Sequence, residues 1–198
     1  MLYPASYNIR VLQNSTWRSV FRFTEKQRAV TAIDIVSGIP TFVSSCHDYS
    51  VNDKIVFASS EAVPCGLPLN TILYVISDGL TGNSFKVSTT QGGSSIALGL
   101  APAGTIPVSL SASKPISLAG LTLDADIINA ATDTQATTFT VSVTDSQNGL
   151  IQLYLSPATT LALSVGEYRY DLSLTDASGD RFYYLTGNIN VERTYSRL

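Results

Sequence analysis

The chain has 198 residues, of which 44% are hydrophobic and only 14% charged, with a formal net charge of −3 and a single histidine. Ordinary soluble domains carry about 25% charged residues, so neutral polar side chains must cover much of this surface. This composition argues against a nucleic-acid footprint, a membrane-spanning helix and a His-pair metal site. Residues 1–5 lack the basic and apolar regions of a signal peptide, so we expect a soluble protein not secreted by the usual route.

Three segments alternate apolar and polar residues with the period of two that marks a strand. Residues 17–24 place tryptophan and phenylalanine on one side and arginine on the other, and residues 138–144 alternate phenylalanine and valine with threonine and serine. Residues 167–176 follow the same pattern, with Tyr168 and Tyr170 on the apolar side. We therefore expect half-buried antiparallel strands whose apolar side chains enter the core.

Turn signals separate the predicted strands. Residues 78–83, 145–149 and 176–180 are rich in Asp, Asn, Ser and Gly, and the second of these turns ends in Asn-Gly. Ser156-Pro157 predicts the start of a short helix, with Gly166 as its terminator. Many short strands joined by such turns predict a sandwich or a small barrel.

A shift in composition divides the chain. No charged residue lies between Lys86 and Lys114, and glycine, alanine, serine and proline dominate that stretch. Residues 91–95 and 101–104 are predicted to be loops. The alternating pattern returns after Lys114, so the simplest domain boundary lies near residues 111–113.

Cys46, His47 and Asp48 are the one place where three reactive residue types adjoin. Successive strand side chains point in opposite directions, so neighbours in sequence rarely form a nucleophile–base pair. We expect no catalytic or metal role for them, with His47 as a turn residue. Cys46 and Cys65 could form a disulfide, but without a secretory signal free thiols are favoured.

Asp124 and Asp126 lie on the same side of a predicted strand, which raises the question of a cation site. Calcium needs about six to eight oxygen ligands, usually from a dedicated loop, and the sequence has no such loop. The other acidic turns are explained by side-chain capping of the backbone. We expect no metal, no cofactor and no enzymatic activity.

Arginine and tyrosine side chains near the two ends of the chain are the candidate interaction residues, because Arg, Tyr and Trp are enriched at protein interfaces. An exposed aromatic set, made of Trp17 with Tyr183 or Tyr184, could instead bind a glycan, although the alternation points Trp17 to the core. A solvated strand face is the plainer alternative. The candidates are Tyr3, Tyr7, Arg10, Arg18, Arg22, Tyr183, Tyr184, Arg193, Tyr195 and Arg197.

Two further stretches carry turns and strands in a distinctive order. An Asn-Gly turn, a strand, a short turn led by proline, a Gly-x-Tyr strand and a final Gly-x-x-x-Val strand resemble the Ig-like N-terminal domain of upper baseplate proteins in tailed-phage virions. That resemblance implies an N-terminal strand pair at residues 7–12 and 16–24. It is carried by residues 149–155, 157–160, 166–179 and 185–191, with 115–120 matching the family's Pro-x-x-Leu-x-Gly pattern.

The second stretch, residues 30–110, resembles a small β-rich repeat module of phage structural and fibre proteins. The matching segments are residues 47–57, 66–67, 71–76, 83–90 and 92–93. The family typically has glycine where this chain has Tyr49 and Asn52. Asn52 tolerates the left-handed turn that glycine would adopt, whereas Tyr49 departs from the pattern.

Together the resemblances imply an all-β chain in which an Ig-like antiparallel β-sandwich, residues 1–28 plus 112–198, hosts a small β-barrel or β-sandwich domain at 29–111. They imply a structural protein of the virion, in the tail, baseplate or fibre-attachment region, that assembles with other virion proteins and copies of itself. We expect no nucleic-acid or membrane partner. A capsid decoration or neck protein, or a module that binds a host-surface glycan, are the alternatives.

Overall fold

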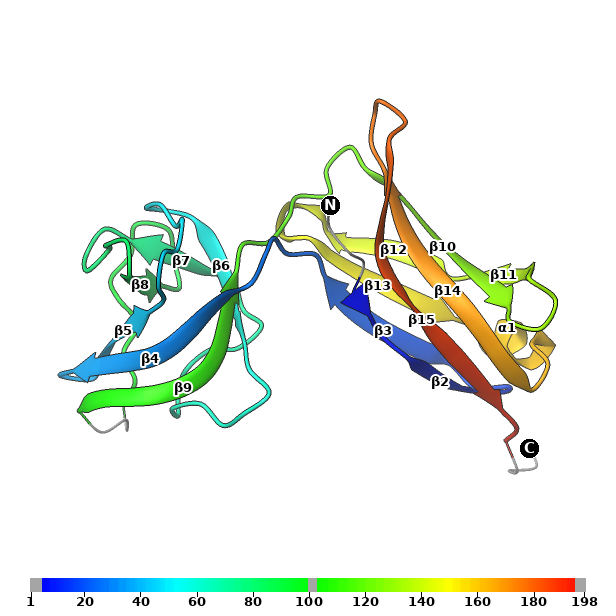
Figure 1. Cartoon of the computed structure of the whole chain (residues 1–198), viewed down its shortest axis with the longest axis horizontal. Coiled ribbons are helices and arrows are strands. Elements are labelled where there is room, and N and C mark those ends of the chain that lie inside the picture. Colours follow the sequence, from blue (N-terminus) through cyan, green and yellow to red (C-terminus); the bar gives the residue numbers. More distant parts are fainter. Residues whose placement is uncertain (1–4, 100–102, 195–198) are drawn as a thin grey trace. The chain divides into compact units, whose positions relative to one another are not determined.

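The computed structural model describes residues 5–99 and 103–194, and the chain divides into two compact units (Figure 1). Met1–Arg22 and Ser117–Leu198 form the first, here called the sandwich unit; Phe23–Ile116 form the second, the barrel unit. Nearly all of the regular secondary structure in both units is β-strand, so the predicted all-β class is confirmed. Among the residues described, no helix is long and apolar enough to span a membrane.

The sandwich unit consists of a large and a small sheet. In the large sheet, β15 pairs with β14, β14 with β10 and β10 with β11, all antiparallel, whereas β1 and β2 both run parallel to β15. The small sheet has the order β12-β13-β3. The strands are β1 (Ala5–Ser6), β2 (Ile9–Leu12), β3 (Trp17–Arg22), β10 (Thr122–Asn129), β11 (Thr134–Thr138), β12 (Thr140–Asp145), β13 (Leu150–Leu155), β14 (Gly166–Thr175) and β15 (Arg181–Glu192).

This strand order is that of an Ig-like sandwich. β3, β13 and β12 take the places of strands B, E and D, and β10, β14 and β15 those of C, F and G. At the start of β14, the Tyr168 hydroxyl donates a 3.0 Å hydrogen bond to the Ser164 carbonyl four residues upstream. That contact is the tyrosine corner of Ig-like sandwiches. The barrel unit is therefore inserted between strands B and C.

Phe139 is the point where the chain passes from the large sheet to the small one. Its side chain is buried between the sheets, and its N–H donates a 2.9 Å hydrogen bond to the Ala125 carbonyl. The predicted strand over residues 138–144 is confirmed from Thr140 onward as β12, whereas its first two residues depart, because Thr138 ends β11 and Phe139 lies in neither strand. The apolar–polar alternation of the sequence continues through the break between β11 and β12. The reason is that the Phe139 side chain is buried whether the chain forms one strand or crosses from one sheet to the other.

The predicted helix start and turns form as local chemistry dictates. α1 spans Pro157–Ala162, and Ser156 caps it by accepting a 3.0 Å hydrogen bond from the Thr159 N–H. A 3-10 turn, η1 (Ser146–Asn148), links β12 to β13. Gly166 does not terminate the helix as predicted; it begins β14.

The barrel unit is a closed barrel of order β4-β5-β8-β7-β6-β9. Phe42, Phe57 and Phe85 fill its centre, with Phe42 4.6 Å from Phe57 and 5.5 Å from Phe85 between ring centroids. Gly104, predicted to lie in a loop, begins a ten-residue strand. The strands are β4 (Arg28–Val36), β5 (Ile39–Val43), β6 (Lys54–Ala58), β7 (Leu73–Ile76), β8 (Ser84–Ser88) and β9 (Gly104–Ser113).

The chain enters and leaves the barrel unit along two paired segments. Thr24 and Pro115 form an antiparallel bridge, and the Glu25 N–H donates a 2.8 Å hydrogen bond to the Lys114 carbonyl. This pairing puts the unit boundaries at 22/23 and 116/117 rather than at the predicted 28/29 and 111/112. Because the two ends are adjacent, the unit can be accommodated within a loop.

Tyr49 and Asn52 are the two positions where the resembling module typically has glycine. Asn52 has a φ of 71°, so it adopts the predicted left-handed turn. Tyr49 needs no such backbone and instead uses its ring, which stacks on His47 at 5.0 Å and meets Phe85 edge-on at 5.0 Å. The departure from glycine therefore adds an aromatic ring to the barrel core.

Candidate interaction surfaces

The outer face of the large sheet carries ionic side chains in cross-strand register. Asp171 on β14 lies opposite Asp126 on β10, and Arg169 forms a 2.6 Å ion pair with Asp133. Burial raises the pKa of Asp171, the neighbouring Asp126 carboxylate raises it further, and Arg181 opposes both effects. The face is therefore polar but not uniformly charged.

A bulge in β15 decides which of the adjacent tyrosines faces outward. The β14–β15 register shifts between Leu172 and Ser173, which leaves Tyr184 as the extra residue and pairs Tyr183 with Ser173. Tyr183 is 48% exposed, whereas Tyr184 is half-buried. A bulge can re-aim neighbouring side chains in this way.

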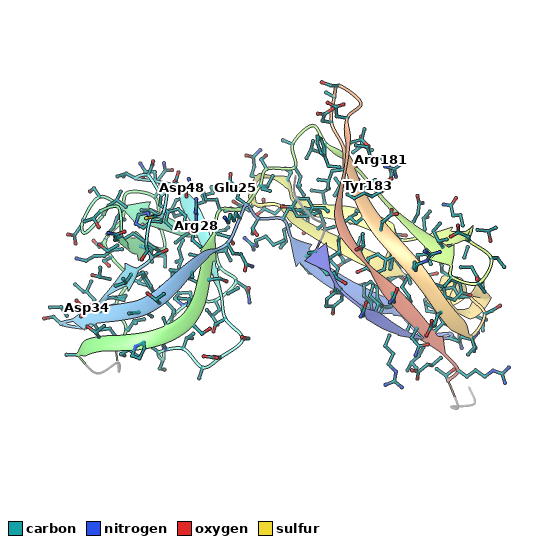
Figure 2. The ribbon with its side chains drawn as sticks, in the orientation of Figure 1. Glu25, Arg28, Asp34, Asp48, Arg181 and Tyr183 are labelled. Atoms are coloured by element: carbon teal, nitrogen blue, oxygen red, sulfur yellow. The ribbon has the colours of Figure 1, made fainter. Side chains whose placement is uncertain are left out.

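Arg181 joins Tyr183 in one polar group on the outer face of the large sheet (Figure 2). Its guanidinium lies 5.5 Å from the Tyr183 ring centroid, and its Nε donates a 2.9 Å hydrogen bond to the Ser173 hydroxyl. A cation held over an aromatic face is a common element of protein recognition surfaces. Both residues come from the start of β15.

A hollow of about 420 Å³ lies on this face, beside β14 and β15. Gly187, one of the lining residues, pairs with the buried Tyr170, so the side chain that it lacks would point to the inner side of the sheet. A β carbon there would overlap the Tyr7 carbonyl and approach Tyr170 Cε1 to 2.9 Å. The lining is mainly polar: Ser6, Asn8, Ile128, Asp133, Arg169, Tyr170, Asp171, Thr186, Gly187 and Asn188.

Tyr7 connects the N-terminal segment to the sandwich. Its N–H donates a 2.9 Å hydrogen bond to the Thr186 carbonyl, and its own carbonyl accepts a 2.7 Å hydrogen bond from the Tyr170 hydroxyl. The half-exposed Tyr7 ring meets Phe21 edge-on at 5.3 Å. Tyr7 therefore both holds the edge of the large sheet and offers aromatic surface.

Arg10 on β2 pairs with Glu192 on β15 rather than standing free. Two hydrogen bonds of 2.9 and 2.5 Å join the guanidinium to the carboxylate, and this contact raises the pKa of Arg10. Exposed pairs of this kind contribute little to stability. Arg10 thus remains a candidate for an exposed polar contact, on a different sheet from Arg18 and Arg22.

The outer face of the small sheet holds the second set of candidate residues. The Arg18 guanidinium lies 5.5 Å from the Tyr154 ring centroid, and Val20 beside it on β3 is 54% exposed. Arg22, at the end of β3, is half-buried, and this burial lowers the pKa of its guanidinium against the attraction of Asp145. Arg18 is therefore the more accessible of the two predicted arginines.

The candidates do not gather into one surface. Tyr7, Arg10 and Tyr183 belong to the large sheet or its edge, Arg18 and Arg22 to the small sheet, and Arg193 is exposed just beyond β15. Tyr3, Tyr195 and Arg197 lie outside the described residues. Trp17 packs on Phe139 at 5.4 Å on the inner side, so it does not combine with either tyrosine into an aromatic platform.

Charged side chains surround one end of the barrel unit. Arg28 pairs with Asp48 at 2.9 Å, and the Lys114 ammonium pairs with Asp53 at 2.7 Å and lies 5.7 Å from the Tyr49 ring centroid (Figure 2 labels Arg28 and Asp48). The Arg28 hydrogen bond lowers the pKa of Asp48. These pairs bridge β4 and the end of β9 to the loop before β6, so they hold the paired segments at the base of the insertion.

The adjacent Cys46, His47 and Asp48 do not converge. His47 Nε2 lies 3.1 Å from the Ser84 carbonyl, Asp48 binds Arg28, and Cys46 is an exposed free thiol in a left-handed turn. Cys65 is also free and exposed. In the part of the chain that the structure describes, no three His, Cys, Asp or Glu side chains are placed to hold a metal ion.

Edge strand β12 is exposed and contains none of the candidate arginine and tyrosine residues. It pairs only with β13 among the described strands, and most of its side chains are exposed. The signal in the sequence was the absence of charge between Asp133 and Asp145.

No protein-family model matches the chain, and a search of curated proteins finds no relative.

Proposed function

We propose that this chain is a structural component of a tailed-phage virion, in the tail, baseplate or fibre-attachment region, and that it acts through protein–protein assembly rather than catalysis. The observation that carries the proposal is the nested architecture: an Ig-like sandwich with a closed barrel inserted between strands B and C. That is the arrangement that the two resemblances to phage modules imply when they are placed on one chain.

Independent cores support a role for each unit as a docking body. The sandwich core includes Phe139, Ile151 and Leu172, and the barrel core includes Phe42 and Phe85, with all five side chains buried. Each unit can therefore keep its shape while its own surface is in contact with another protein. One unit would bind the particle and the other a neighbouring copy or a fibre, and repetition of modest contacts around the particle would supply avidity.

The exposed faces suit this role. Arg181 with Tyr183, and Arg18 with Tyr154, present paired cationic and aromatic groups of the kind enriched at interfaces. Few charges need to lose water when such surfaces pack, because only 14% of the chain is charged. A protein on the head surface would bind its neighbours through the same kinds of contact. The location of the chain within the particle is therefore the second part of the proposal to be tested.

Deletion of the coding sequence from the phage genome tests the function. We expect the deletion to yield particles without a complete tail or fibre apparatus, and we expect wild-type protein supplied in trans to restore it. Electron microscopy of negatively stained particles reads the result. Complete tails and unchanged infectivity in the deletion strain would contradict the proposal, and intact tails with fragile heads would favour the decoration role instead.

A further inference from the structure

The two sheet edges of the small sheet differ in their protection. β3 forms one edge and carries Arg18 and Arg22, whereas β12 forms the other and has no charged residue or proline from Thr140 to Thr144. Edge strands present unpaired N–H and C=O groups, and proteins commonly block such edges with charges, proline or bulges. The bulge of β12 lies at Thr144, the last residue of this segment, and leaves its centre regular.

The sequence of β12 is self-complementary. Residues 140–144 read Thr-Val-Ser-Val-Thr, which is the same in both directions. If a second copy pairs antiparallel about Ser142, Val141 of each copy faces Val143 of the other and the two Ser142 residues face each other. Pairs of β-branched side chains across neighbouring strands are favourable. Val143 is 45% exposed, so its apolar surface is available for such a pair.

Charge does not oppose this register. Asp145 is the acidic residue nearest the axis, and it would face Phe139 of the second copy rather than an acid. The two Asp145 carboxylates would lie six residues apart, about 20 Å at the strand rise. That distance exceeds the Debye length of about 8 Å at physiological salt, so their repulsion is screened.

We infer that a second copy of this chain binds along β12, antiparallel about a two-fold axis at Ser142, so that the small sheets of the two copies become one continuous sheet. The biological meaning of this contact rests on the proposed assembly function, for which it names one partner. A single strand pair buries less than the roughly 1,200 Å² of a stable interface, so the isolated dimer is weak and depends on the particle for avidity.

The neighbouring edge β11 is the poorer candidate. Its residues 134–138 read Thr-Gln-Ala-Thr-Thr, which is not the same in both directions. Gln135 is already bonded to Asp126 at 2.9 Å, and the pairing of β11 with β10 is broken by a register shift. β12 therefore offers the longer regular edge.

Disulfide trapping tests the register directly. In a full-length background with Cys46→Ser and Cys65→Ser, Ser142→Cys places the two thiols directly opposite each other, at the Cα separation that a disulfide requires. Thr140→Cys lies on the same strand and the same face, but residue 140 of one copy would lie about 14 Å from residue 140 of the other. Val20→Cys, on β3, is the matched control on the opposite edge. Each purified variant is oxidised at high concentration and analysed by non-reducing electrophoresis, after circular dichroism has shown that it is folded.

We expect the Ser142→Cys dimer to form at least about tenfold faster than either the Thr140→Cys or the Val20→Cys dimer. Equal rates for all three variants would overturn the inference, as would faster trapping of Thr140→Cys. Adding Val143→Lys to Ser142→Cys should abolish the difference, and its persistence would also contradict pairing along β12. If Ser142→Cys forms no cross-linked dimer, pairing along β12 is overturned but the proposed function is not. The proposed function fails only if deletion of the coding sequence leaves particles complete and infectious.

Discussion

The Tyr170 hydroxyl donates a 2.7 Å hydrogen bond to the Tyr7 carbonyl, across the place where Gly187 leaves β15 without a side chain. The bond joins strand F of the sandwich to the N-terminal segment, and the glycine allows the two to approach. This contact explains why a glycine stands inside a long strand, where it has no conformational advantage of its own.

Gly187→Ala should destabilise the sandwich unit by about 1–3 kcal/mol, because the added methyl group overlaps the Tyr7 carbonyl and the backbone must shift. Urea unfolding followed by circular dichroism measures the change. Gly82→Ala is the control, since a β carbon there meets nothing within 4 Å. Equal stabilities for the two variants would show that the close approach at Gly187 is relaxed in solution.

Lys114→Met should destabilise the barrel unit by about 1–3 kcal/mol, because it removes the cation that binds Asp53 and the Asp48 carbonyl while keeping the length of the side chain. Lys86→Met is the comparison, since Lys86 pairs with the largely exposed Asp78 and should cost less than about 1 kcal/mol. Thermal unfolding of both variants decides the point. A larger loss at Lys86 would contradict the role of Lys114 at the base of the insertion.

Asp171→Asn should raise the unfolding temperature at pH 7. Burial and Asp126 raise the pKa of Asp171 in the folded state above the ordinary value of 3.8, so its ionisation opposes folding. The folded state holds the proton more tightly, and stability is therefore lost as pH rises from 3.8 through the raised value. The advantage of the variant should be full at pH 7, should shrink as pH falls through the raised value toward 3.8 and should be lost below 3.8; a difference independent of pH would refute this assignment.

The barrel unit, residues 23–116, should fold cooperatively when it is expressed alone. Its ends are already paired with each other through Thr24 and Pro115, and its aromatic core lies within the fragment. Differential scanning calorimetry should record one transition. The shorter fragment 29–111 lacks the paired ends and should be less stable, and equal stability would place the boundaries at 28/29 and 111/112.

Local chemistry made part of the fold predictable. The alternation at 167–176 identified β14 with Tyr168 and Tyr170 inside, Ser156 was recognised as a helix cap, and Asn52 as a left-handed turn. Each of these features depends on side chains within a few residues of one another. The order of strands in the two sheets followed from the resemblance to an Ig-like module and not from the local pattern.

Features set by pairing between distant strands were not predictable from the alternation. The break at Phe139 arises because its backbone meets Ala125, and the outward turn of Tyr183 arises because β14 shifts register against β15. The exposure of β12 likewise depends on which strand lies at the edge of the small sheet. The candidate arginines and tyrosines were chosen by residue type, which is why they spread over both sheets.

Quantitative mass spectrometry of gradient-purified phage particles tests the central claim most directly. If the chain is a structural component of the virion, its peptides should be present in a fixed ratio to the major tail proteins and should persist after a high-salt wash. The absence of the chain from particles, while it accumulates in the infected cells that produce them, would contradict the claim.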